Sequence, residues 1–240
     1  MMKPRMQKFF VLLVVALATV ASSRPRFQGS LHLASGLLQG EFKENTGNDG
    51  FGLTGDFFYS PSRSIFSIGV SAGFLVYGMD SRRQPLSSEF PDFTIKVSTD
   101  NSMVLAQLVL RLQNPTGRLR PYVEGVAGLN YLYTETRIEN ADDWYENDRI
   151  ASKVDFDDTA LNYGAGGGMQ WDVYTATPRE GQEYHPLSVA LDFQAKYLIG
   201  EQASYLKKGS VHRENGKVLY DVKQSKTDMV LIQIGAAIRF

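Results

Sequence analysis

Apolar residues occupy every second position through the last thirteen residues of the chain, which run from Asp228 to the terminal Phe240. Counted back in steps of two from the end, the apolar positions are Phe240, Ile238, Ala236, Ile234, Ile232 and Val230. The positions between them are mixed and partly polar. Because alternate side chains of a β-strand point to opposite faces, this stretch predicts a strand with one apolar face and one wetter face. A terminal strand leaves an unpaired edge, and pairing with the first strand of a closed barrel removes that edge.

Seven further segments alternate in the same way, and none has the i, i+3, i+4 spacing of an amphipathic helix. They cover residues 27–37, 51–59, 66–76, about 93–112, 123–133, 161–173 and 189–197. Segments of about ten residues with period two match strands that cross a bilayer at a tilt. The connections alternate between short turns and long, Gly-rich or charged loops. This layout predicts an all-β fold, an eight-stranded antiparallel up-and-down transmembrane β-barrel, with both termini on the periplasmic, short-turn side.

The aromatic residues favour a membrane-spanning barrel over a soluble one. Those on the apolar faces near the short turns are Tyr59, Phe66, Trp171 and Phe240, and those near the long loops are Phe74, Tyr131, Tyr133, Tyr163 and Tyr197. Two aromatic belts at these levels are typical of the two interfaces of a membrane. A soluble sandwich or a lipocalin also alternates, but its apolar face points inward and gives no reason for two belts.

The first 23 residues have the features of a secretory signal peptide. Three basic residues precede an apolar run from Phe9 to Val20, which is too short to span a bilayer. We therefore expect residues 1–23 to be a signal peptide and residues 24–240 to form one outer-membrane β-barrel domain. Later in the chain no run of eighteen apolar residues occurs, which excludes a spanning helix but leaves a barrel open.

The cysteine content and the net charge limit the kinds of protein and of partner that the sequence allows. The chain contains no cysteine, so it is not a lipoprotein and carries no disulfide. Its net charge is −1, and removal of the first 23 residues, with three bases and no acid, lowers it to −4. This balance argues against nucleic acid as a partner.

Three stretches carry a resemblance to a known group of proteins. They are the alternating strand that ends at Phe240, the strand opening Arg-Pro-Tyr-Val-Glu-Gly at 120–125, and Leu-Asp-Phe-Gln-Ala-Lys-Tyr at 191–197 ahead of Gly200. With them, residues 24–240 resemble the small eight-stranded bacterial outer-membrane β-barrels, the group that includes the outer-membrane protein A-like and opacity-type proteins.

The resemblance implies a location and two partners. The expected location is the bacterial cell outer membrane, in contact with outer-membrane lipid. The resemblance also implies insertion by the barrel-assembly machinery, which reads a C-terminal signal carried here by Phe240 and Ile238. It is specific for architecture and says little about activity.

The polar parity of the strands faces the predicted lumen. Its polar members include His32, Asp56, Gln107, Arg111, Glu124, Asn130, Gln170, Asp172, Asp192, Gln194, Lys196 and Arg239. An eight-stranded barrel is just wide enough for side chains to fill, and charges there must pair or stay wet. We expect a packed polar core, and the alternative is a narrow path for solutes.

One lumenal ion pair follows from the register. If the turn between the fourth and fifth strands is centred between Gly117 and Arg118, positions whose numbers add up to 235 face each other. Arg111 then lies opposite Glu124 on the inward face. Opposed residues have Cβ atoms about 4.5–5.5 Å apart, close enough for a guanidinium to meet a carboxylate.

Candidate catalytic and metal chemistry is sparse. The three histidines lack the Ser or Asp spacing of outer-membrane hydrolases and proteases, so we expect no enzyme activity, no metal and no cofactor. The glycine-rich run 164–168 continues as a strand and not as a helix, so it fits small residues inside a tight barrel better than a phosphate cradle.

Two predicted loops carry opposite charge. Residues 138–158 carry −6 and residues 201–227 carry +3. The loops either remain solvated, pair with each other, or use the acidic loop to hold a divalent cation, although no calcium-loop spacing is present. In the second loop, Asn215-Gly216 lies between two strand-like runs and predicts a hairpin turn, so the last two segments should continue beyond the membrane as a ribbon. The sequence as a whole predicts an outer-membrane barrel with a structural or surface-interaction role, including adhesion to an unidentified surface ligand. The alternatives are a narrow channel for small solutes or ions, and a lipid-modifying enzyme.

Overall fold

The computed structural model describes residues 26–240 except 62–63, 88–89, 141–148, 176–186 and 215–216. The predicted signal peptide, residues 1–23, lies outside the described residues. The elements are β1 (Arg26–Leu38), α2 (Gly40–Thr46), β2 (Gly50–Ser60), β3 (Phe66–Ser87), β4 (Phe90–Gln113), β5 (Leu119–Asn140), β6 (Arg149–Thr175), β7 (Ser188–Gly200), β8 (Gln202–Glu214), β9 (Lys217–Lys226) and β10 (Met229–Arg239). In this part of the chain no helix is long and apolar enough to cross a membrane.

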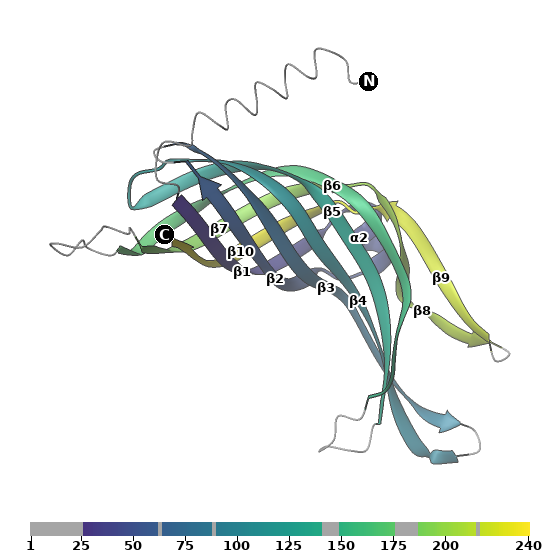
Figure 1. The fold of residues 1–240 in the computed structure, drawn as a ribbon. Helices are drawn as coiled ribbons and strands as arrows, with labels where there is room; N and C mark the ends of the chain where they lie inside the picture. Colours follow the sequence, from purple (N-terminus) through teal and green to yellow (C-terminus); the bar gives the residue numbers. More distant parts are fainter. Residues whose placement is uncertain (1–25, 62–63, 88–89, 141–148, 176–186, 215–216) are drawn as a thin grey trace, which may run out of the picture.

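Eight strands close into a barrel in the order β1-β10-β7-β6-β5-β4-β3-β2, and every neighbouring pair is antiparallel (Figure 1). The last strand pairs with the first from Gln28 opposite Arg239 to Leu38 opposite Met229, so neither has a free edge within the barrel. The eight alternating segments of the sequence are these eight strands. The prediction of an eight-stranded antiparallel up-and-down barrel is confirmed.

The two faces of the strands divide as the alternation predicts. The outward positions expose large apolar side chains around the whole barrel, among them Leu31, Leu33, Phe57, Val70, Leu108, Leu110, Leu129, Leu161, Phe193, Ile232 and Ile234. Leu108 is 66% exposed, whereas its neighbour Gln107 is 5% exposed. Apolar residues therefore cover the outside of the barrel, and the inward parity is buried.

Two connections that the sequence predicts as loops are strand. β3 runs on to Ser87 and β4 begins at Phe90, so these two strands form a ribbon beyond the barrel. In the same way β5 runs on to Asn140 and β6 begins at Arg149, within the predicted loop 138–158. Both ribbons extend from the end of the barrel away from the C-terminus (Figure 1). Paired backbone groups in a ribbon satisfy each other, which explains why polar, charged sequence still forms strands there.

The connection 201–227 forms a sheet of its own. β8 pairs with β9, and Glu214 lies opposite Lys217 on either side of Asn215 and Gly216, the predicted turn, which lies outside the described residues. The ribbon is therefore a separate two-stranded sheet and not a continuation of the barrel strands. Asp158 of β6 accepts a hydrogen bond from the Ser204 backbone N–H of β8 at 2.7 Å. This bond connects the ribbon of β5 and β6 to the ribbon of β8 and β9.

A short helix, α2, follows β1 and was not predicted. Gly47 ends it with a left-handed backbone (φ 73°) and donates its N–H to the Lys43 carbonyl. Phe42 is fully buried, with its ring centroid 5.4 Å from that of Tyr77 and 4.9 Å from that of Tyr205. Seven residues make only two turns, so one buried ring leaves no periodic signal in the sequence.

Candidate functional site: the barrel lumen

Apolar side chains close the lumen at the long-loop end. Phe42 of α2, Tyr77 of β3 and Tyr205 of β8 meet there, each 2% exposed or less. Strand residues complete this apolar plug: Leu75, Met103, Leu132, Leu198, Met229 and Leu231. In this half of the lumen, buried apolar side chains therefore stand beside buried polar ones such as Asn101, Asn130 and Thr134.

A network of charged residues fills the middle of the lumen around Glu124. The Nε and Nη2 atoms of Arg111 both lie 3.0 Å from Glu124 Oε2, and the Lys196 ammonium lies 3.1 Å from Oε1. Gln194 donates its amide to the same Oε1. One carboxylate thus holds two cations, and all three charged side chains are at most 1% exposed.

The register explains how these residues meet across four strands. Arg111 lies opposite Glu124, Glu124 opposite Gly166, and Gly166 opposite Lys196. Gly166 has no side chain, and a Cβ there would lie 2.9 Å from Cγ of Lys196. The glycine therefore leaves the space in which Lys196 reaches past it to the carboxylate.

Aromatic rings complete the surroundings of Arg111. Its guanidinium carbon lies 3.9 Å from the ring centroids of both Phe58 and Tyr122. A cation between two aromatic faces is stabilised by both rings, and the contact is strongest where water is excluded. Tyr122 fits because Gly168 lies opposite it: a Cβ at Gly168 would approach the Tyr122 hydroxyl to 2.4 Å.

Asp192 lies next along the lumen. It accepts hydrogen bonds from the Tyr122 hydroxyl at 2.7 Å and from the Gln170 amide at 2.9 Å. His32 lies between two carboxylates, with Nε2 3.4 Å from Asp192 and Nδ1 3.6 Å from Asp56. A glycine again lies between the two partners: in the strand register Gly235 of β10 is opposite His32 of β1 on one side and Asp192 of β7 on the other.

Gln107 belongs to a chain of neutral polar residues. Its amide donates to Asn162 at 2.7 Å, and the Asn162 amide donates to Asn130 at 2.7 Å. The Asn130 amide in turn reaches the Thr227 hydroxyl at 3.5 Å. All four residues are at most 5% exposed, so this polar layer is packed and connected.

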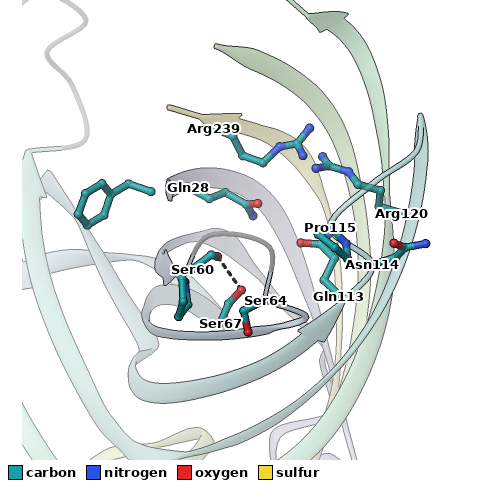
Figure 2. Close-up of a pocket in the computed structure, with 11 residues that line it drawn as sticks. Gln28, Ser60, Ser64, Ser67, Gln113, Asn114, Pro115, Arg120 and Arg239 are labelled. Carbon is teal, nitrogen blue, oxygen red and sulfur yellow. Dashed lines mark hydrogen bonds between the residues drawn. The ribbon is translucent and has the colours of Figure 1, made fainter. Parts of the chain in front are cut away.

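The short-turn end holds the remaining predicted lumenal residues. Arg120 and Arg239 both donate to the Oδ1 atom of Asp172, the former at 2.6 Å. Arg120 also reaches Gln170 at 3.4 Å. Two hollows lie at this mouth, one of about 40 Å³ (Figure 2) and one of about 540 Å³ that opens outward.

The predicted assembly residues lie on the outside of the barrel at this same end. The backbone N–H groups of Phe240 and Phe27 each donate to the carbonyl of the other, at 3.0 and 2.9 Å. The Phe27 ring also packs near those of Phe57, Tyr59 and Phe240, with centroids 5.7–6.2 Å apart. Ile238 is 46% exposed and pairs with Gly29 of β1. The aromatic group therefore covers the seam at which the barrel closes.

Histidine and possible metal ligands, within the described residues, bear on the expectation of no enzyme activity and no metal. His32, the one histidine whose side chain is described, is 1% exposed and enclosed by the network. Among the described residues no group of three or more His, Asp and Glu side chains is placed to hold a metal ion.

No family model matches the chain, and no curated protein matches it significantly. Solved structures do match over most of its length. Ail, the attachment invasion locus protein of Yersinia pestis, in complex with the heparin analogue sucrose octasulfate, is 15% identical over 90% of this chain and 99% of its own, with a TM-score of 0.37. Neisserial surface protein A is 11% identical over 90% and 95%, with a TM-score of 0.35. A major outer membrane protein from Thermus thermophilus is 15% identical over 90% and 100%, with a TM-score of 0.35. The fold is assigned as a barrel from its strand pairing and not from these matches.

Sequence reasoning placed Arg111 opposite Glu124 but did not find the contacts of Lys196, Tyr122 and Phe58. The missing step was the register of β5 with β6 and of β6 with β7. The glycines at three successive inward positions of β6, residues 164, 166 and 168, are the signal that could have found these contacts, because they mark where neighbouring strands send large side chains inward.

Proposed function

We propose that the protein is an integral outer-membrane barrel with a closed lumen, which serves as a rigid anchor for three ribbons outside the membrane. Its role is structural or one of surface interaction through those ribbons. The single observation that supports this most strongly is the filled lumen. An apolar plug and a bonded charge network follow one another along its axis, and each consists of buried side chains.

The outside of the barrel supports the membrane location. Large apolar side chains are exposed on every barrel strand, which would be unstable in water over so wide a surface. Aromatic residues occur at both edges of this band, with Phe66, Trp171 and Phe240 toward the short turns and Phe74, Tyr163 and Tyr197 toward the ribbons. Such belts are favourable at the two interfaces of a bilayer.

Conductance distinguishes this proposal from a channel. The refolded protein, inserted in planar bilayers in potassium chloride, should produce no discrete conductance steps. Protein denatured in the same detergent serves as the control for leakage. Reproducible single-channel steps from the folded protein, absent from the denatured control, would reject the closed lumen and favour the channel.

Shortened ribbons test the surface role without disturbing the barrel. Leu206 lies opposite Val222 in β8 and β9, so an Asn-Gly turn can join them in place of residues 207–221. This variant keeps the Tyr205 contact with the plug. Thr134 and Phe156 are opposite in the same way, and a turn there replaces 135–155.

Cells that produce each variant are compared with cells that produce the wild type at an equal surface level. Sedimentation measures attachment between cells, and binding to glass measures attachment to a surface. We expect the shortened proteins to insert normally and to lose cell-to-cell or surface attachment. Unchanged attachment by both variants would leave either the ribbon of β3 and β4 as the contact surface or a purely structural role. Loss of heat-modifiable folding would instead show that the ribbon is part of the barrel's stability.

A further inference from the structure

Three arginines contact Asp172 at the short-turn mouth of the barrel, two through its carboxylate and one through its backbone carbonyl. Arg120 and Arg239 share the Oδ1 atom of Asp172, and Arg118 donates its Nε–H to the Asp172 carbonyl at 3.3 Å. Arg118 comes from the turn between β4 and β5, and Arg239 from the end of β10. These four side chains carry a net charge of +2, so one carboxylate does not neutralise them locally.

Two hollows adjoin this group. The larger, of about 540 Å³, opens outward and includes Arg118, Arg120, Asp172, Ser188 and Arg239 in its lining. The smaller, of about 40 Å³, is lined by Arg120 and Arg239 together with Gln28, Ser60, Ser67 and residues of the neighbouring turns. Arg120 and Arg239 line both, so the guanidinium groups form the boundary between them.

Two buried donors at the smaller hollow have no hydrogen-bond partner. Gln28 is 5% exposed, and its amide nitrogen has no hydrogen-bond partner; the Nε of Arg239 is likewise buried and unpartnered. The two hydroxyls of Ser60 and Ser67 bond to each other, and the Gln113 amide donates to Gln170. Figure 2 shows Arg120 and Arg239 extending toward each other on one side of this hollow, with Gln28 beside them.

Unpartnered donors and excess positive charge at an open hollow are complementary to an anion. Guanidinium groups present planar pairs of N–H donors that match the oxygens of phosphate or carboxylate. Nearly all buried donors in proteins have a partner, so the unpartnered Nε–H of Arg239, which lines both hollows, calls for an acceptor at the mouth. The larger hollow has room for a tetrahedral oxyanion, and the smaller one has room only for water or a single small group.

We propose that the short-turn mouth is a binding site for a phosphate-type oxyanion, held by Arg118 and Arg239 with Arg120 behind them. The proposal goes beyond the anchoring role and does not depend on it. Two sources share this chemistry, a free inorganic anion and the phosphodiester of a lipid headgroup at the adjacent membrane surface.

Binding of inorganic phosphate to the full-length folded protein in octyl glucoside, which contains no phosphate, tests the site by calorimetry at constant ionic strength. We expect saturable binding at one site. Arg118→Gln should weaken it about tenfold, as loss of one charge-assisted hydrogen bond implies. Arg118 is exposed and contacts only a backbone carbonyl among the contacts described, so the variant should fold. Arg239→Gln should weaken binding by a similar factor and leave Asp172 paired with Arg120.

Lys43→Gln is the matched control, because it removes one cation at the opposite end of the barrel, where Lys43 pairs with Asp49 at 2.7 Å. It should bind phosphate as the wild type does. Equal weakening by Lys43→Gln and Arg118→Gln, or a heat signal that sodium chloride reproduces, would overturn the proposal. Absence of saturable binding would also overturn it and leave water as the partner of the unpartnered donors.

A second titration separates the sources. Dihexanoyl phosphatidylglycerol below its micelle concentration supplies the phosphodiester, and dihexanoylglycerol is the same molecule without it. Tighter binding of the phospholipid than of inorganic phosphate supports a headgroup site, and tighter binding of phosphate supports a free anion. Equal binding of the two diacyl compounds would show that the contact is apolar, and would reject the oxyanion.

Discussion

Glu124 should be more important to barrel stability than Arg111, although the two form one ion pair. The carboxylate contacts two cations, Arg111 at 3.0 Å and Lys196 at 3.1 Å, and each of the three side chains is buried. Glu124→Gln therefore leaves two buried cations without the carboxylate that they contact. Arg111→Met leaves Glu124 paired with Lys196 and also hydrogen-bonded to Gln194.

The magnitudes follow from burial. Removal of one partner of a buried pair costs about 3–5 kcal/mol, because an uncompensated charge remains. Arg111→Met should cost about 3 kcal/mol, near the low end, because Glu124 stays paired with Lys196. Part of this cost comes from the lost contacts of the guanidinium with the rings of Phe58 and Tyr122. Glu124→Gln should reach about 5 kcal/mol. The double variant leaves only Lys196 uncompensated, so the coupling energy should be about 2–3 kcal/mol.

The assay is urea unfolding of the barrel in lipid vesicles, with folded and unfolded protein separated by their mobility on an unheated gel. Lys43→Met is the control, since its pair with Asp49 is about one-third exposed and should contribute about 0–1 kcal/mol. A larger loss from Arg111→Met than from Glu124→Gln would refute the shared carboxylate. Losses below about 1 kcal/mol in both variants would show that water reaches the network.

Three further changes test other parts of the molecule. Leu108→Arg, on the outward face, should cost about 2–4 kcal/mol in vesicles by the same urea assay, whereas Leu119→Arg at the short-turn edge should cost about 0–1 kcal/mol, and equal costs would contradict the bilayer position. Phe42→Ala should lose about 3–5 kcal/mol, because the fully buried ring leaves a cavity between Tyr77 and Tyr205; a loss below about 1 kcal/mol would mean that α2 does not close the lumen. Deletion of Phe240 should slow assembly and leave protein in the periplasm, as measured by pulse-chase and fractionation of cells, and normal insertion would remove the terminal strand from this role.

The barrel could be predicted because its determinants are local. Period two assigns each residue to a face, and a short turn fixes the register of the two strands that it joins. Arg111, Glu124 and the turn at Gly117 lie within fifteen residues of one another, and Gly117 takes the left-handed backbone (φ 100°) that a turn here needs. The pairing of Arg111 with Glu124 in the structure is the register drawn from that turn alone.

The contacts that escaped prediction involve longer connections. Lys196 reaches Glu124 only through two registers, across β6, and the connection from β6 to β7 is long enough to allow several alternatives. The ribbons formed by β3 with β4 and by β5 with β6 escaped for a different reason. Residues beyond the membrane need not alternate, because both faces of a ribbon meet water, so period two gives no sign of the strands there. The plug was missed because Phe42 and Tyr205 come from outside the eight segments.

Charge balance links the closed lumen to its open mouth. With His32 left out, the described lumenal charges are four cations, Arg111, Arg120, Lys196 and Arg239, and four anions, Asp56, Glu124, Asp172 and Asp192. The lumen as a whole is therefore neutral, which lowers the cost of enclosing so many charges away from water. The balance is not uniform along the axis, however. Two of the four cations share Asp172 at the mouth, and the compensating carboxylates lie deeper, beside His32. Arg118 adds one further positive charge outside the neutral set. An anion that approaches from the short-turn side thus meets the positive end of a neutral network, and the carboxylates that would repel it lie behind the guanidinium groups.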